Sequence, residues 1–342
     1  MTGVRTVLLT GAGGVVGQSL LREAGTAGRA MRMIATARRP VALPDAARVV
    51  TADVTRPRLG LSPSAYRELA AETDVVIHSA GLTEWGLPAA AYEPVNVRGT
   101  RHVAEFALRA GAPVHFISTA FVAAVLPGAH PPLGDGNVTA AYVRSKLAAE
   151  RLLREAGVPH TVFRPTNLIG DAATGKTSRG QIVQLLSDWI CRGRAPFLPV
   201  HQGNRIDVVP QDLLSHAVLA AIGSDLTRGE FWVTYGAEAM DMEAALGVCA
   251  EHLAARGGRL NPPPVVDPDS EQARNVGHLP PATRSYLAVL RDVSDVTRSS
   301  GGVLPTSMPE LRERFGLPRV ADTDAYRRTL RYAAGIAARA GA

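Results

Sequence analysis

The feature that most constrains the fold is an apolar segment that runs directly into a glycine-rich turn. Arg5–Thr10 (Arg-Thr-Val-Leu-Leu-Thr) has the pattern of a strand buried on both faces. Gly11-Ala-Gly-Gly-Val-Val-Gly17 follows, and Gln18–Glu23 has helical character. Glycines between a strand and a helix let the backbone approach a pyrophosphate, whose charge is favoured at the helix N-terminus. This pattern favours dinucleotide binding over a plain glycine turn. The residues expected to contact the dinucleotide are Gly11, Gly13, Gly14, Val15, Val16 and Gly17.

Two arginines follow the next predicted strand, Met31–Thr36. An acidic residue at this place would bind the ribose 2′-hydroxyl of NAD, but the chain has Arg38 and Arg39. Two guanidinium groups suit a 2′-phosphate, so we expect NADPH (NADP) to be favoured over NAD. The alternative is a pair of solvated surface arginines, because arginine is common in this chain.

Strands and helices alternate along the first two thirds of the chain. Asp53 and Val54 end a third strand and are expected at the adenine, and Ala80 follows a fourth strand with small neighbours. This alternation predicts an α/β protein with a Rossmann-type doubly wound parallel sheet and a smaller C-terminal substrate lobe. The further predicted strands are Val49–Ala52, Asp74–His78, Val114–Ile117, Thr161–Arg164, Arg205–Pro210 and Glu230–Tyr235. The further predicted helices are Asn96–Ala110, Tyr142–Gly157, Gln181–Ile190, Gln211–Ile222, Asp241–Ala255 and Asp322–Ala340, the last burying Leu330, Tyr332 and Ile336.

Tyr142 and Lys146 lie four residues apart in a segment with helical character, so both face one side of the helix. A phenol beside an ammonium is a proton donor with a lowered pKa. Only two lysines occur in the chain, Lys146 and Lys176, which favours a specific role for the first. Thr119 follows the strand Val114–Ile117, at the sheet end where ligands bind.

Composition restricts the class of protein. The chain has 342 residues, 46% of them hydrophobic and 20% charged, without an apolar run long enough to span a membrane or a recognisable signal peptide. We therefore expect a cytoplasmic protein. The two cysteines and nine scattered histidines have no metal-ligand spacing, so no metal is expected. The net charge of +6 is dispersed, which argues against nucleic acid and fits an anionic cofactor, substrate or acidic partner.

Together these motifs resemble the extended short-chain dehydrogenase/reductase superfamily, over about 4–221. The resemblance rests on Thr10-Gly-x-x-Gly-x-x-Gly17, Asn96-Val-x-Gly-Thr100, Ser118-Thr119, Tyr142-x-x-x-Lys146 and Arg164-Pro165. The segment Asp53-Val-Thr-x-Pro-x-Leu-Gly-Leu-Ser62 and Arg164-Pro-Thr-Asn-Leu-Ile-Gly-Asp171 are similar to the thioester reductase and fatty acyl-CoA reductase branch. NAD-dependent epimerases and dehydratases are relatives.

The resemblance implies a role for each site residue. Tyr142 would protonate the reduced carbonyl oxygen, Thr119 would hold that oxygen, and Lys146 would lower the phenol pKa and bind the nicotinamide ribose. Pro165, Asn167 and Leu168 would contact the carboxamide. The resemblance implies an NADPH-dependent reductase that acts on a carbonyl, either a small molecule or an acyl thioester on a carrier protein or CoA. We expect a free-standing enzyme or a relative of the reductase domain. We also expect a homodimer, formed through helices Asn96–Ala110 and Tyr142–Gly157.

Three alternatives stay open. An epimerase or dehydratase would hold its NAD(P) tightly and recycle it, and a redox sensor would bind the dinucleotide without turnover. Gly170-Asp-Ala-Ala-Thr-Gly-Lys-Thr177 matches the P-loop pattern of nucleotide-hydrolysing proteins, although Pro165 makes the preceding strand irregular. For the domains we expect a nucleotide-binding unit over 1–170, with 205–235 packing back onto it. A substrate lobe is expected over 171–204 and 236–342.

Overall fold

A seven-stranded, fully parallel sheet forms the centre of the protein. The computed structural model describes residues 4–26 and 31–340. The strand order is β10-β6-β5-β4-β1-β2-β3, and every neighbouring pair is parallel. The strands are β1 (Arg5–Thr10), β2 (Met31–Ala37), β3 (Arg48–Thr51), β4 (Val75–His78), β5 (Val114–Ile117), β6 (His160–Pro165) and β10 (Gly229–Val233). The order reverses between β1 and β4, which places the ligand crevice at the carboxyl ends of these two strands.

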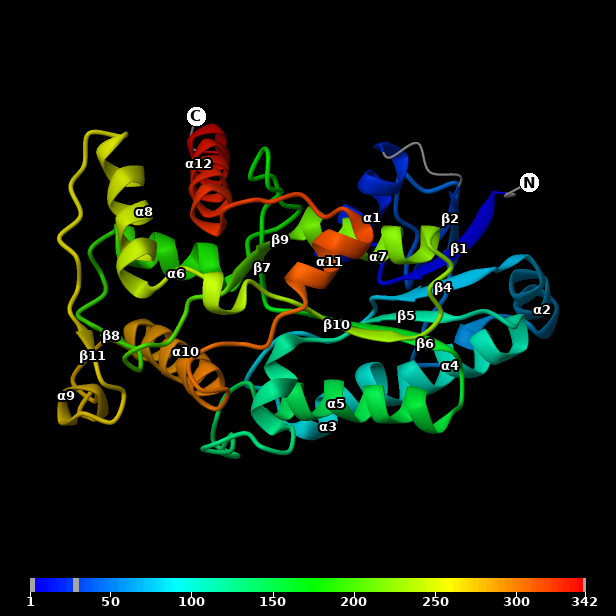
Figure 1. The fold of residues 1–342 in the computed structure, drawn as a ribbon, viewed down its shortest axis with the longest axis horizontal. Helices are drawn as coiled ribbons and strands as arrows, with labels where there is room; N and C mark the ends of the chain where they lie inside the picture. The colour runs from blue at the N-terminus through cyan, green and yellow to red at the C-terminus, as the bar shows by residue number, and fades with distance from the viewer. Residues whose placement is uncertain (1–3, 27–30, 341–342) are drawn as a thin grey trace.

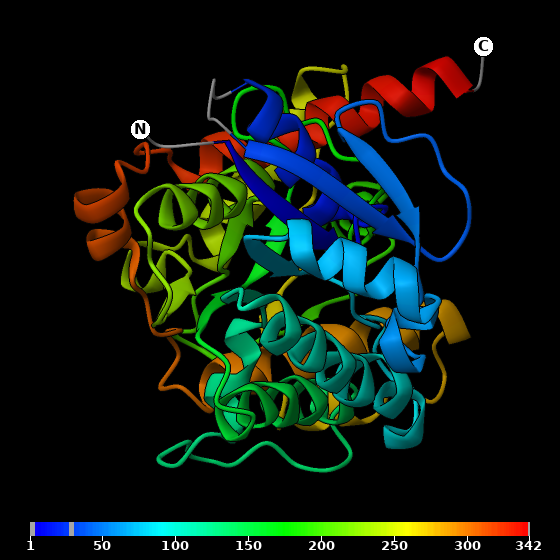
Figure 2. The ribbon, with the colours of Figure 1, turned by 90° about the vertical axis from the view of Figure 1, so that its right-hand side faces the viewer.

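Helices cover both faces of this sheet, as Figures 1 and 2 show. One face carries α1 (Val15–Thr26), α7 (Gln211–Gly223) and α11 (Met308–Phe315). The other face carries α2 (Pro63–Glu72), α4 (Arg98–Ala110) and α5 (Ala140–Glu155). The central strands are apolar on both faces because each face packs on a helical layer, and β4 and β5 are buried at every position. The predicted doubly wound sheet is confirmed.

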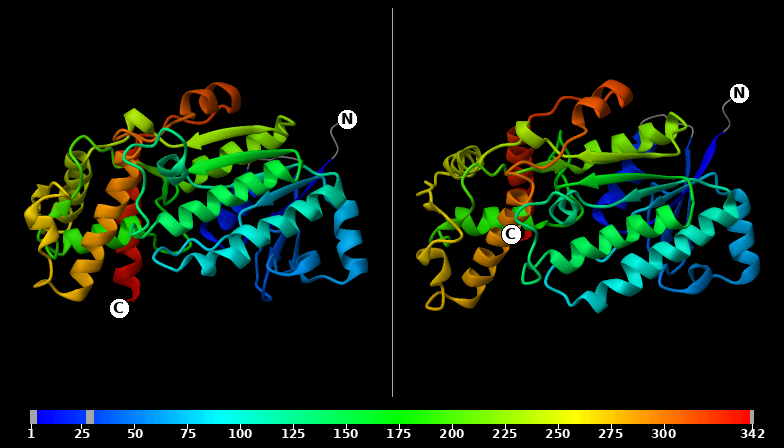
Figure 3. Two further views of the ribbon diagram at one scale, coloured as in Figure 1. Left: turned by 90° about the horizontal axis from the view of Figure 1, so that it is seen from below. Right: turned by 60° about the horizontal axis from the view of Figure 1, so that its bottom comes forward.

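A second group of helices lies beyond the carboxyl ends of the strands, on the left of Figure 1 and again in Figure 3. It surrounds its own core around Trp189, Leu198, Val248 and Tyr326. Its helices are α6 (Ile182–Cys191), α8 (Met242–Ala254), α9 (Glu271–Arg274), α10 (Pro281–Arg298) and α12 (Asp322–Ala340). Short parallel pairs join β7 (Asn167–Ile169) to β9 (Val208–Pro210), and β8 (Leu198–Pro199) to β11 (Val265–Val266).

The chain crosses between the main sheet with its helices and the second group of helices more often than the expected domain boundaries imply. Met308, Leu311 and Phe315 of α11 join the sheet core beside α7 and β10, although 308–315 falls within the expected substrate lobe. The predicted strand Arg205–Pro210 is confined to β9, because Asn204 and Arg205 belong to the loop that precedes it.

The helix α12 follows its predicted bounds. Leu330 is buried and Tyr332 half-buried on it, while the side chain of Ile336 lies outside the described residues. Along 4–26 and 31–340, no helix is long and apolar enough to cross a membrane.

Candidate active site

The glycine turn brings β1 and α1 into close contact. Gly11 has a φ of +72°, and a Cβ atom at this position would lie 2.5 Å from the backbone nitrogen of Ala80. A Cβ atom on Gly17 would lie 2.4 Å from the Gly11 carbonyl oxygen. Gly13 meets nothing within 4 Å, so the space above the start of α1 is open. The unpaired N–H groups of the first helical turn therefore face a space that a pyrophosphate fits.

A cleft of about 640 Å³ begins at this turn and extends over the carboxyl ends of the strands. This volume lies within the usual range for ligand sites. The cleft brings together Gly14, Val15, Val16, Thr119, Tyr142, Lys146, Pro165, Asn167 and Leu168, all of which we expected at the site. Residues from α5, β7 and the glycine turn thus meet in one place.

Thr119 and Tyr142 lie together in the cleft, where the Thr119 hydroxyl favours the ionised form of the Tyr142 phenol. Thr119 caps a short 3-10 helix, Ala120–Val125, and its Oγ1 accepts a hydrogen bond of 3.3 Å from Phe121 N. Tyr142 is only 7% exposed. Burial raises the pKa of Tyr142 to about 12, and the opposing hydrogen bond from Thr119 is the smaller effect. Burial in this low-dielectric environment is the dominant effect on the phenol, and the lowering of its pKa that we expected from Lys146 stays a prediction.

Lys146 lies one turn along α5 from Tyr142 and is 5% exposed. Its Nζ donates to the Ile117 carbonyl oxygen at a distance of 2.5 Å and lies 4.2 Å above the centre of the Phe116 ring. Burial lowers the pKa of Lys146 to about 7, and Glu150 partly opposes this shift. The ammonium is thus poised between its charged and neutral forms at neutral pH.

A buried ion pair lies beneath Lys146. Glu150, another turn along α5, receives two hydrogen bonds of 3.1 and 2.7 Å from the Arg164 guanidinium. Arg164 also lies 2.8 Å from Glu230, and its guanidinium covers the Trp232 ring at 4.5 Å. The Ser118 hydroxyl also donates a hydrogen bond to Glu150. The hydroxyl proton of Ser118 is therefore already in use, which distinguishes Ser118 from Thr119.

The segment after β4 is fixed by two polar side chains, His78 and Asn96, to which the sequence analysis gave no catalytic or binding role. His78 lies between Thr10 Oγ1 at 2.8 Å and Thr100 Oγ1 at 3.0 Å. Burial, together with nearby Lys146, lowers the pKa of His78 to about 3, so this imidazole is neutral. It holds β1, β4 and α4 together beneath the cleft.

Asn96 connects the same segment to the helix that carries Tyr142. Its side chain pairs with both backbone groups of Leu82, at 2.7 and 3.0 Å, and donates to Ser145 Oγ at 2.8 Å. Asn96 occurs in a π-helical turn, Glu93–Val97, a distortion that often accompanies functional sites.

The remaining residues that we expected to bind the cofactor lie outside the cleft. Arg38 and Arg39 are exposed at the carboxyl end of β2. Asp53 accepts two hydrogen bonds from Thr55. Burial raises the pKa of Asp53, but these two bonds and the positive charges of Arg38 and Arg56 outweigh burial, so the pKa is lowered overall. Val54 is buried against Gly99 of α4. Arg38, Arg39, Asp53, Val54 and Ala80 do not line the cleft itself.

A family model for NAD-binding proteins, described as male sterility protein, matches residues 31–218. This match covers more than half of the chain. The protein belongs to this family. The resemblance to the extended short-chain dehydrogenase/reductases and to their thioester reductase branch is confirmed, and with it the prediction of an oxidoreductase that binds NAD(P).

Two curated relatives of this family member are multidomain synthetases. The hybrid PKS-NRPS synthetase mpsA of Macrophomina phaseolina is 34% identical over 275 residues, which is 74% of this chain and 7% of the synthetase. The hybrid PKS-NRPS synthetase pvhA of Talaromyces variabilis is 30% identical over 265 residues, or 73% of this chain and 6% of the synthetase. The chain spans less than a tenth of the length of either relative.

Solved structures show the same fold. The terminal R domain from the myxalamid PKS-NRPS biosynthetic pathway superposes with a TM-score of 0.74 and 23% identity, covering 100% of this chain and 93% of that chain. The Bordetella bronchiseptica enzyme WbmG in complex with NAD and UDP has a TM-score of 0.63 and 20% identity, covering 98% and 94%.

In the segment 170–177, which matches the P-loop pattern, a side chain of the segment itself binds the backbone N–H groups. Asp171 Oδ1 accepts from the backbone N–H groups of Ala173 and Thr174, at 3.1 and 3.0 Å. A Cβ atom on Gly175 would lie 2.2 Å from the Arg328 carbonyl oxygen. The glycines therefore serve packing on α12, and a carboxylate already occupies the backbone donors that would face a phosphate.

One histidine–carboxylate cluster has metal-like spacing, at His201, Asp267 and Asp269. Arg298 lies 3.1 Å from Asp269, and His201 Nε2 is 2.7 Å from Asp295. A guanidinium thus already balances the carboxylates there, and the expected absence of a bound metal stays a prediction.

Several residues that line the cleft were not predicted from the sequence, because they belong to no recognisable motif. Trp85 and Val138 come from loops, Arg179 and Gln181 from the segment before α6, and Val289 from α10. The only signal for Trp85 was its place shortly after the small residues that follow β4.

Proposed function

We propose that this protein is an NADPH-dependent reductase of acyl thioesters, carried on a carrier protein or on CoA. The observation that supports it best is the pairing of the Thr119 and Tyr142 hydroxyls beside Lys146, in a cleft that begins at the glycine turn. The relation to synthetases and the likeness to R domains support a thioester substrate.

The reduced nicotinamide supplies a hydride to the carbonyl carbon when it is bound. Glycine-turn N–H groups hold the pyrophosphate, and Asn167 and Leu168 offer backbone to the carboxamide. Thr119 and Tyr142 hydrogen-bond the carbonyl oxygen and stabilise its developing negative charge. A phenol whose pKa is about 12 stays protonated at neutral pH, so it can give its proton to that oxygen.

Lys146 binds the nicotinamide ribose in this proposal. A bound dinucleotide would bring the negative charge of its phosphates into the same cleft, and nearby negative charge favours the protonated form of Lys146. Arg38 and Arg39 supply the preference for NADPH, because both are exposed and follow β2, where the ribose of a dinucleotide would lie.

The direct test measures NADPH consumption with a panel of acyl thioesters, aldehydes and ketones. We expect stoichiometric oxidation of NADPH with thioesters, and a loss of at least about a hundredfold in kcat for Tyr142→Phe. Tyr92→Phe is the matched control, because its hydroxyl donates to the Glu84 carbonyl oxygen instead of lying with Thr119. Near-normal turnover by Tyr142→Phe would contradict the proposal.

An epimerase or dehydratase is the alternative on this fold, to which WbmG and UDP-galactose 4-epimerase are similar in structure. Such an enzyme would retain bound dinucleotide through purification and consume none. The reductase instead requires added NADPH and oxidises one equivalent per hydride transferred.

A further inference from the structure

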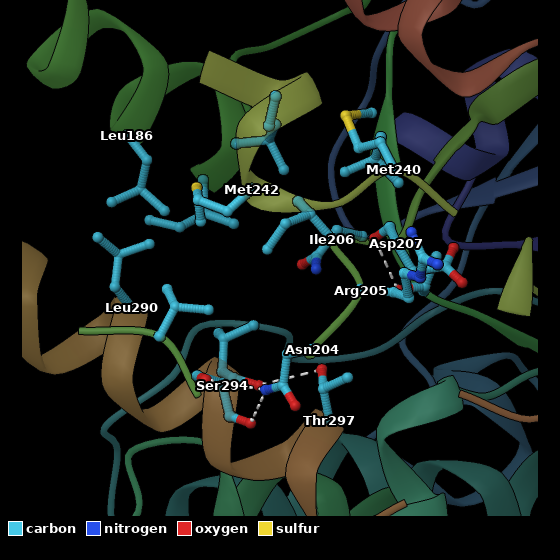
Figure 4. Close-up of a pocket in the computed structure, with 18 of the residues that line it drawn as sticks. Leu186, Asn204, Arg205, Ile206, Asp207, Met240, Met242, Leu290, Ser294 and Thr297 are labelled. Carbon is cyan, nitrogen blue, oxygen red and sulfur yellow. Dashed lines mark hydrogen bonds between the residues drawn. The ribbon is translucent and has the colours of Figure 1, made fainter. Parts of the chain in front are cut away.

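A second cavity, of about 110 Å³, adjoins the cleft. It lies between α6, α8 and α10, where Figure 4 shows Leu186, Met242 and Leu290 pointing inward from separate elements. Four residues line both spaces: Phe121, Thr166, Asn167 and Ile182. The second cavity is therefore separated from the proposed site of reduction by a single layer of side chains.

The polar groups of this cavity are largely used by the protein itself. Thr166 Oγ1 donates to the Asp207 carbonyl oxygen at 3.0 Å, and Asn204 Nδ2 donates to Ser294 at 2.7 and 2.9 Å. Ser187 Oγ lies 2.5 Å from the Tyr326 hydroxyl. The two charged residues in the lining also have partners: Arg205 lies 3.8 Å from Asp241, and Asp207 accepts from the backbone N–H groups of Tyr235 and Gly236. Most of the other lining residues are apolar: Phe121, Ile182, Val183, Leu186, Ile190, Val200, Ile206, Val208, Met240, Met242, Ala245, Leu290, Val293 and Leu304.

A hydroxyl or charged group placed in such a cavity would lose its water without gaining a partner. A hydrocarbon group meets no such cost. The chemistry of the walls thus selects an aliphatic ligand, and the two methionines adapt to its shape.

The size of the cavity limits the length of that ligand. An apolar cavity of about 150 Å³ accommodates benzene, with its six carbons. By the same proportion a cavity of 110 Å³ accommodates about four or five carbons.

We propose that this cavity binds the aliphatic end of the acyl group, so that the enzyme selects acyl thioesters whose chain ends in about four or five aliphatic carbons. This inference rests on the proposed function. The connection between the two sites is local: Phe121 lines both spaces, and its backbone N–H donates to Thr119 Oγ1 at 3.3 Å. A carbonyl held by Thr119 therefore directs its chain past Phe121 and Ile182 into the cavity.

The first experiment compares straight-chain acyl-CoA thioesters from acetyl to dodecanoyl. Each added methylene that enters the cavity should raise kcat/KM about fourfold, and the rise should stop once the cavity is full. A terminal hydroxyl on the preferred chain should lower kcat/KM at least about tenfold. Equal kcat/KM along the series would overturn the inference.

Variants on α8 change the size of the cavity at a distance from Thr119, Tyr142 and Lys146. Met242→Ala should lengthen the preferred chain by about two carbons, and Ala245→Leu should shorten it. Ala254→Leu, an exposed position on the same helix, is the matched control and should leave the preference unchanged. An unchanged chain-length optimum in both cavity variants, with normal folding by circular dichroism, would overturn the inference.

A binding measurement separates this inference from the proposed function. S-alkyl-CoA thioethers cannot be reduced, so calorimetric titration reports their affinity independently of turnover. If no thioester is reduced, the proposed function fails, and the thioethers still decide the inference. Affinity that rises with chain length and shifts with Met242→Ala supports it, whereas affinity independent of chain length overturns it.

Discussion

The burial of Lys146 has a measurable effect on stability. Its ammonium is 5% exposed, and burial lowers its pKa from 10.5 to about 7. Below pH 7 both folded and unfolded chains carry the proton, so the full cost of burying the charge is present. Between pH 7 and 10.5 only the unfolded chain binds the proton, so stability rises with pH. Above pH 10.5 neither the folded nor the unfolded chain carries this proton, so the cost of burying the charge is absent.

The magnitude follows from the size of this shift. One pH unit in this window changes the free energy of unfolding by about 1.4 kcal/mol per proton. From pH 7 to 10 the cofactor-free protein should therefore gain on the order of 4 kcal/mol relative to Lys146→Met, which has no proton to lose.

The assay is urea unfolding of the wild-type protein and Lys146→Met at several pH values, after removal of the dinucleotide. The difference between the two removes the contribution of every other titrating group. Lys176→Met is the matched control, because Lys176 is exposed. The chain has only two lysines, so carbon-13 labelling of lysine gives an NMR titration with two signals.

Two results would refute this reasoning. One is a difference between wild type and Lys146→Met that stays constant within about 1 kcal/mol across the window, since burial of the charge predicts a slope. The other is a lysine NMR titration in which neither signal changes near pH 7.

Four further outcomes are expected. Arg38→Ala and Arg39→Ala should each raise the KM for NADPH about tenfold and leave that for NADH unchanged in steady-state assays; equal effects on both cofactors would contradict a 2′-phosphate contact. Glu150→Ala should lower the free energy of unfolding in urea by about 3 kcal/mol, because the buried Arg164 guanidinium loses two hydrogen bonds, whereas exposed Glu155→Ala should cost under about 1 kcal/mol. Gly175→Ala should lower Tm, because its Cβ would meet the Arg328 carbonyl at 2.2 Å, while Lys176→Ala should not affect nucleotide binding as it would in a P-loop. Light scattering should give the mass of a homodimer, and a monomer mass would contradict the expected association through α4 and α5.

The local part of the fold could be predicted from the sequence. A strand, a glycine turn and a helix follow each other within 5–23, and each element is specified by its own residues. The same is true of α5, where the spacing of Tyr142 and Lys146 places both in one cleft. Such features depend on contacts between residues close in sequence, so pattern alone describes them.

Features that depend on distant packing could not be predicted. The pKa of Tyr142 is raised by burial among residues from several elements, and no spacing within α5 reveals that environment. A pair of prolines such as Pro280-Pro281 is typical of loops, but proline also begins helices, and Pro281 is the first residue of α10. Val289 and Leu290 of α10 line the cleft and the cavity only because the chain returns from a distant segment.

The position of α11 has a consequence for how the protein can be divided. Met308, Leu311 and Phe315 pack beside α7 and β10, after the chain has already built most of the second group of helices. A fragment ending after β10 would contain every strand of the main sheet, yet it would expose the apolar surface that α11 covers. Such a fragment should aggregate or melt early, so the nucleotide-binding half folds stably only when the last quarter of the chain is present.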